Sequence, residues 1–221
     1  MAQETLRPEY ARLELLQEIT TSNGSKAREI IFYRAKCSDM TALISDVRGG
    51  DRIEHFVASC CRAVNGGAEP LPFSSRELDA SDAAEVSSVM NTMWREGESL
   101  EPTTKEGAPG HMTDGDGISS PIVYTLLHEI KLNPAEDAEA IKQIQFQARR
   151  VGEISEYLDS RGEPTKEFSA FMRTFGQLMG TRLPLTDAVI GAMDFEDYGV
   201  IRRKILGKLA VSRGRWKKTS T

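Results

Sequence analysis

The residues that could do chemistry in this chain of 221 residues are few and widely separated. The three histidines, His55, His111 and His128, fall in an expected helix, linker and strand, without the clustered partners that a metal site needs. The sequence contains no Cys-x-x-Cys pair, no His-Glu-x-x-His motif, no phosphate-binding loop and no nucleophile elbow. It therefore predicts no catalytic site, no metal and no cofactor, and the chain is not expected to be an enzyme.

Two short motifs have a chemical and a structural interpretation. Cys60 and Cys61 are adjacent, and neighbouring side chains on a helix point about 100° apart, so they do not form a chelating pair. We expect Cys60 to pack in the core. The run beginning at Asp114 (DGDG) has carboxylates spaced as in a calcium loop, but positions 6 and 12 hold Ser119 and Thr125 in place of glycine and a carboxylate. It is interpreted as a flexible turn.

The sequence contains two similar halves. The segment LLQEI at 15–19 reappears as LLHEI at 126–130. Further matching pairs follow in the same order with offsets of 111 to 115 residues: 30–35 with 144–149, 40–44 with 154–158, 56–63 with 168–175, 71–72 with 183–184, and 78–82 with 193–197. An unbroken series of this kind predicts a tandem duplication.

Hydrophobic periodicity gives both halves the same expected elements. Alternation over 13–19 and 123–130 predicts half-buried strands, and turn residues followed by a second β-prone run complete a hairpin in each half. Apolar residues then recur at helical spacing from Ile53 to Val64 and from Phe168 to Met179. The predicted fold class is α+β, with two tandem repeats, each a β-hairpin followed by about three α-helices.

The expected domain boundaries follow from composition. The first unit spans 1–95 and the second 118–210, each ending in two short helices. Between them, 96–117 is rich in glycine and proline and poor in large apolar residues, which is typical of a flexible linker. Residues 211–221 form a basic C-terminal tail.

Charge and hydropathy restrict the class of protein. Residues 199–221 carry eight Lys or Arg and no Asp or Glu, so the rest of the chain carries a net charge of −13. An acidic body argues against a nucleic-acid partner, because nucleic-acid-binding proteins spread positive charge over one face. No apolar run is long enough for a membrane span, and the N-terminus lacks the features of a signal peptide. We expect a soluble, cytoplasmic protein.

An aromatic stripe on the second unit is the first candidate for binding a partner. Phe168, Phe171 and Phe175 share one face of the predicted helix. Such a stripe more often packs in a core, yet a small unit has limited core, so part of it could form a groove for an apolar helix.

The basic C-terminal stretch is the second candidate. Arg202 and Arg203 should lie on the last helix, and Arg215, Trp216 and Lys217 in the tail beyond it. A large aromatic side chain among cations can anchor a protein partner. Folding of Trp216 back onto the domain is an equally weighted alternative.

The second unit resembles the small tail assembly chaperones of Mu-like and related tailed phages. The resemblance covers nearly all of 118–210 and, more weakly through the duplication, 12–95. The family pattern has a strand with proline, an aromatic residue and leucine, a second strand with an arginine near its end, and an aspartate element before the last helix. The matching residues here are Pro121, Tyr124, Leu126, Phe146, Arg149, Asp194 and Asp197. Family members are usually single units, whereas two are joined in this chain.

The resemblance implies a phage tail assembly chaperone in the host cytoplasm. It would bind the tape measure protein, a long and largely helical chain, and recruit tail tube protein around it; homo-oligomers are possible. A structural tail or baseplate component that is retained in the virion is the main alternative. A nucleic-acid-binding regulator that uses the basic tail is less favoured.

Overall fold

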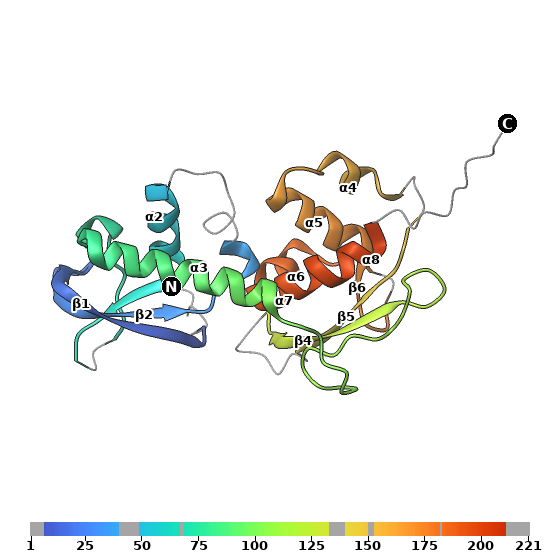
Figure 1. Ribbon diagram of the computed structural model, residues 1–221, viewed down its shortest axis with the longest axis horizontal. Helices are drawn as coiled ribbons and strands as arrows, with labels where there is room; N and C mark the ends of the chain where they lie inside the picture. Colours follow the sequence, from blue (N-terminus) through green and yellow to red (C-terminus); the bar gives the residue numbers. More distant parts are fainter. Residues whose placement is uncertain are drawn as a thin grey trace.

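The alternating run near the N-terminus folds into the first of two three-stranded antiparallel sheets (Figure 1). The structure, a computed structural model, describes residues 7–39, 49–66, 69–132, 140–149, 153–181 and 183–210. Strand β1 (Glu9–Thr20) pairs with β2 (Lys26–Tyr33) through a turn in which Gly24 has a φ of 84°. Glycine adopts this left-handed conformation without the steric cost that other residues incur.

Helices and a third strand complete the first half of the molecule. A short 3₁₀ turn, η1 (Cys37–Asp39), follows β2. Helix α2 (Gly49–Cys60) passes without a loop into β3 (Cys61–Val64), which pairs antiparallel with β2. The 3₁₀ turn η2 (Ser75–Glu77) then leads to α3 (Ala80–Ser99), whose first turn is capped by the Asp79 side chain.

The second half is built around its own three-stranded antiparallel sheet. Strands β4 (Ile122–Ile130), β5 (Ile141–Phe146) and β6 (Gly176–Leu178) pair in the order β4-β5-β6. The helical segments in this half are α4 (Ser155–Asp159), α5 (Pro164–Phe175), α6 (Asp187–Ala192), α7 (Phe195–Val200), the π-helical turn η4 (Ile201–Leu206) and α8 (Gly207–Ala210). The expected α+β class with a hairpin in each half is confirmed.

Both helical stripes are shorter than predicted. The helices expected to reach Val64 and Met179 end at Cys60 and Phe175, and the next apolar residues form β3 and β6. Hydrophobic spacing could not separate the two states, because a short buried strand also reads as a continuous apolar run. The third strands supply hydrogen-bond partners to the otherwise unpaired edges of β2 and β5.

The segment predicted as a flexible linker begins inside a helix and then pairs with a sheet. Residues 96–99 belong to α3, so the last helix of the first unit, which was expected to end near residue 95, continues to Ser99. Farther along, the Thr113 N–H donates to the carbonyl of Val123 at 2.9 Å, and Met112 forms an antiparallel bridge with Tyr124. The division into domains stays a prediction. Predicted matches within 40–44 and the tail at 211–221 lie outside the described residues.

The aromatic stripe on α5 lies in the core. Phe168, Phe171 and Phe175 are each at most 4% exposed. Phe171 stacks on Phe146 with ring centroids 6.0 Å apart, and Phe168 meets Tyr198 edge-on at 4.3 Å. Of the two interpretations that the sequence left open, the structure therefore favours core packing for this stripe.

Cys60 is fully buried, as predicted for a core residue. Among the described residues, no helix combines the length and the apolar character that crossing a membrane would require.

Replacing Phe171 with Asp should unfold the second half of the protein. Truncating a buried phenylalanine alone costs about 3–5 kcal/mol, and the new carboxylate would have no partner in this cluster. Chemical denaturation followed by circular dichroism measures the loss. Lys166→Asp on the exposed face of the same helix is the matched control and should change the unfolding free energy by less than about 1 kcal/mol. Equal stability of the two variants would contradict the core assignment.

Candidate functional site: a charged cluster between the two halves

The segment that follows β2 pairs with the residues around the start of α7, and this pairing joins the two halves. The Cys37 N–H donates to the carbonyl of Met193 at 2.9 Å, and the Phe195 N–H donates to the carbonyl of Ala35 at 3.0 Å. Trp94 of α3 packs on the ring of Phe195 with centroids 5.3 Å apart. These backbone contacts place the residues on either side of them in fixed positions.

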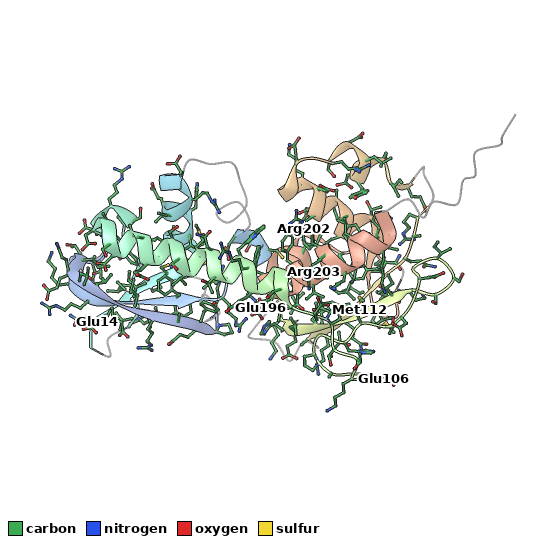
Figure 2. The ribbon with its side chains drawn as sticks, in the orientation of Figure 1. Glu14, Glu106, Met112, Glu196, Arg202 and Arg203 are labelled. Carbon is green, nitrogen blue, oxygen red and sulfur yellow. The ribbon has the colours of Figure 1, made fainter. Side chains whose placement is uncertain are left out.

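Arg34, His128 and Glu196 form an ion-pair cluster at this junction, and Figure 2 shows Glu196 between the two halves. The Glu196 Oε2 atom lies 2.6 Å from Arg34 Nη1 and 2.8 Å from His128 Nε2. The hydrogen bond from His128, helped by Arg34, lowers the pKa of Glu196 to about 2. The same bond raises the pKa of His128 above its usual value.

The cluster includes a set of groups that resembles a metal site. Ligand atoms of His128, Asp194 and Glu196 all lie within 4.8 Å of one another. Clustering of His128 with acidic partners was not expected from the sequence. However, the Arg34 guanidinium bonds to the same Glu196 oxygen as His128, so a cation of the chain already neutralises this carboxylate. The geometry supports an ion pair between halves better than metal ligation.

Asp197 anchors the neighbouring strand from within the core. It is fully buried, and its Oδ1 atom accepts hydrogen bonds from the Tyr124 hydroxyl at 2.9 Å and the Leu127 N–H at 2.7 Å. Its Oδ2 atom accepts from the His128 N–H at 3.3 Å. Strand β4 has a register shift between Thr125 and Ile130, which directs these N–H groups away from β5. Burial raises the pKa of Asp197 to about 7, against these hydrogen bonds, which lower it.

The first half contains a matching arrangement. Asp82 is 2% exposed, and its two carboxylate oxygens lie 3.3 and 3.2 Å from the Leu16 N–H. Strand β1 has a register shift between Glu14 and Ile19, where that N–H is released from the ladder. In both halves the aspartate occupies the third position of a helix and is preceded by an aspartate cap, Asp79 or Asp194.

Two open grooves flank η1 on the surface beside this cluster. One has a volume of about 910 Å³, with a partly apolar lining that includes Leu127 and Ala188 and cations that include Lys36 and Lys131. The other, of about 740 Å³, is mostly acidic; its charged lining residues are Glu156, Asp159, Glu163, Lys166, Arg173 and Asp187. Glu129, Asp187 and Asp194 also line the first groove, so its rim carries charges of both signs. Its apolar contacts within this mixed rim suit an amphipathic partner better than the mostly acidic groove does.

The basic residues predicted for partner binding are only partly brought together. Arg203 donates to the carbonyl of Leu100 and lies 3.1 Å from Glu101, while Arg202 is exposed on the same helical turn (Figure 2). The predicted tail residues, Arg215, Trp216 and Lys217, lie outside the described residues. The buried stripe on α5 offers no surface to a partner.

The sequence patterns did not predict the hydrogen-bonding roles of Asp82 and Asp197 or the ion-pair cluster at the junction. The repeat alignment contained a usable signal, because it pairs LLQEI and LLHEI with each other and also pairs two aspartate-rich segments, 78–82 and 193–197. Nothing in the sequence alone indicated that each leucine-rich strand would receive its hydrogen bonds from the aspartate-rich segment of its own half.

Replacing Asp197 with Asn should flatten the pH dependence of stability. An aspartate whose pKa is about 7 in the folded state and 3.8 when unfolded binds more protons when folded, so its contribution falls as pH rises from about 4 to 7. The unfolding free energy of the natural protein should therefore decline relative to Asp197→Asn across this window, by at most about 1.4 kcal/mol per pH unit. Urea denaturation between pH 2 and 8 provides the measurement.

Glu196→Gln is the control of opposite sign. The lowered pKa of Glu196 contributes stability above pH 4.5, and this contribution is lost as pH falls toward 2. Relative to Glu196→Gln, the natural protein should therefore lose stability on acidification. A parallel response of the two variants would contradict the assigned environments.

No protein-family model, curated protein or solved structure matches the chain.

Proposed function

We propose that this chain is a phage tail assembly chaperone, which binds the tape measure protein in the host cytoplasm and promotes assembly of tail tube protein around it. The observation that carries the proposal is the resemblance of the second unit to that family, together with a second, similarly ordered unit in the same chain. No covalent chemistry is required for this role. A long helical client exposes an apolar stripe that aggregates unless another surface covers it.

Beyond the α+β class, we infer that the two halves of the fold arose by tandem duplication. In each half a hairpin leads to a helix, which passes directly into a third strand beside the hairpin. The bulge contacts also correspond: Leu16 and Leu127 are offset by 111 residues, and Asp82 and Asp197 by 115. These are the limits of the offset range in the sequence repeat, so the contacts follow the alignment.

The positions that carry the resemblance have mainly structural contacts. Tyr124, Leu126 and Phe146 are buried, and the Arg149 Nε–H donates to the carbonyl of Thr174 at 3.1 Å. Asp197 holds the β4 bulge. A shared pattern at such positions supports a common architecture, and the client must be recognised by other residues.

We place the client on the groove that contains Leu127, Ala188, Lys36 and Lys131. An amphipathic helix could lay its apolar stripe against the apolar part of this groove, with charged residues facing the rim, where both cations and carboxylates lie. Two units in one chain could cover two stretches of a long client, and the second contact gains from effective concentration. The buried α5 stripe is left out of this interface.

Retention in the virion as a structural tail or baseplate component is the second candidate. It is favoured by the joined halves, because backbone pairing, the Arg34–Glu196 ion pair and the Trp94–Phe195 contact are typical of a permanent body. A nucleic-acid role is less favoured, since Arg203 and Lys204 already bind Glu101 within the chain.

Quantitative mass spectrometry of infected-cell lysate and purified virions separates the two candidates. A chaperone is abundant in the lysate and missing from the particles. A fixed copy number in each particle would overturn the chaperone proposal and establish the structural one.

Replacing Ala188 with Glu should weaken capture of the tape measure protein. The exposed alanine lines the proposed groove, and a bulky carboxylate there would clash with the apolar stripe of the client and be buried without a partner. We expect at least a tenfold loss of affinity, about 1.4 kcal/mol, in pull-down or calorimetry with the co-expressed client. Ala84→Glu, at an exposed alanine of α3, is the matched control. Equal loss in both variants, or loss in neither, would remove the client from this groove.

A further inference from the structure

The outer edges of the two sheets are protected unequally. Ala63 of β3 exchanges two backbone hydrogen bonds with Leu71, at 2.8 and 2.9 Å, and β6 is bridged by Pro184. The edge of β4 is covered by residues 110–113. Within the part of the chain that the structure describes, the outer edge of β1 between Arg12 and Glu14 has no such neighbour, and Figure 1 shows β1 along the border of its sheet.

The ladder geometry shows which groups face outward from β1. Because Ala63 uses its N–H and carbonyl on Leu71, it does not bond to Ile30, its register partner on β2. The backbone groups of Ile30 therefore point toward β1 and bond to Leu13. Successive residues of a strand alternate in direction, so the N–H and carbonyl groups of Arg12 and Glu14 point away from the sheet.

The corresponding edge in the second half is filled by an extended segment. The carbonyl of Val123 accepts from the Thr113 N–H at 2.9 Å, while Thr125 donates to the carbonyl of His111 at 2.8 Å and accepts from the Gly110 N–H at 2.9 Å. At the repeat offset of 111 residues, Val123 and Thr125 correspond to Arg12 and Glu14. The fold thus contains, in its own second half, an example of strand addition at this position.

We propose that the open edge of β1 pairs with β1 of a second copy of the chain, antiparallel about Leu13. The outward-facing residues permit three registers: Arg12 opposite Arg12, Glu14 opposite Glu14, or Arg12 opposite Glu14 in both directions. Like charges directly opposite destabilise a strand pair, and opposite charges stabilise it. The third register avoids both repulsions and uses all the outward backbone groups of these two residues. Such an interface is self-complementary, as a two-fold dimer requires.

The charges on β1 and β2 favour this partner over an uncharged strand. Glu14 stands directly opposite Glu29 of β2, which places two carboxylates side by side. Arg12 binds Glu29 at 3.3 Å and Glu9 at 2.7 Å, whereas Glu14 has no ion pair among the described residues. Arg12 of the second copy would supply Glu14 with the missing cation.

The β1 bulges make the proposed dimer weak. Register shifts lie between Glu9 and Ala11 and between Glu14 and Ile19, so only Arg12 to Glu14 form a regular edge. Within the second shifted stretch, Leu16 is 73% exposed. The association should therefore depend on concentration and weaken with salt. The proposal does not rest on the proposed function.

Sedimentation equilibrium of the full chain from micromolar to millimolar concentration tests the proposal. Arg12→Glu and Glu14→Arg should each weaken association by about tenfold or more, because each places like charges opposite one another. The double variant Arg12→Glu/Glu14→Arg restores opposite charges and should recover association to within about threefold of the natural chain. Lys166→Glu, in an exposed ion pair on α5, controls for charge reversal elsewhere.

Thermal melting of each variant separates lost association from lost folding. Glu14→Arg is the single change less apt to disturb folding, because the new arginine faces Glu29 within the chain. The proposal is overturned if the natural chain stays monomeric throughout. It is also overturned if the single variants associate normally, or if the double variant is as weak as the singles.

Discussion

A buried carboxylate that accepts hydrogen bonds from a bulged strand organises each half of the molecule. The bulge turns the Leu16 or Leu127 N–H out of its ladder, and a buried N–H without a partner would cost about 1–3 kcal/mol. Asp82 and Asp197 supply that partner from the first turn of a helix, where negative charge also interacts favourably with the helix dipole. One side chain thereby fixes where the helix begins relative to the sheet.

The junction between the halves depends on that placement. Because α7 starts next to the β4 bulge, Phe195 and Met193 can pair with Ala35 and Cys37, which follow β2. The same pairing brings Glu196 within reach of Arg34 from one half and His128 from the other. The desolvation cost of Glu196 is offset by two donors, which is why a partly buried cluster is compatible with stability here. The groove lined by Leu127 and Ala188 lies beside this junction, so its shape depends on the same contacts.

Sequence patterns predicted what depends on local periodicity. Alternation identified both hairpins, and helical spacing identified α2 and α5, since each signal comes from neighbouring residues that share a face. The third strands were missed because they are short and follow a helix without turn residues. The ion-pair cluster was missed because Arg34 lies 94 residues from His128, a distance along the chain over which periodicity carries no information.

The unequal protection of the two sheet edges follows from one turn. Gly117 has a φ of 72°, and a Cβ at Gly115 would lie 2.2 Å from the carbonyl oxygen of Pro121, so glycines are needed where the chain reverses before β4. The Asp116 side chain accepts hydrogen bonds from the N–H groups of Ile118 and Ser119, which fixes the reversal. This turn, whose sequence only superficially matched a calcium loop, returns residues 110–113 along the edge of β4. Preceding β1, the carbonyl of Pro8 instead accepts from the Arg34 N–H, so the chain continues beside β2 at that point. The chain itself therefore supplies a partner for the edge of β4, whereas the described residues supply none for the edge of β1. A second copy can bind at the edge of β1 with the least rearrangement.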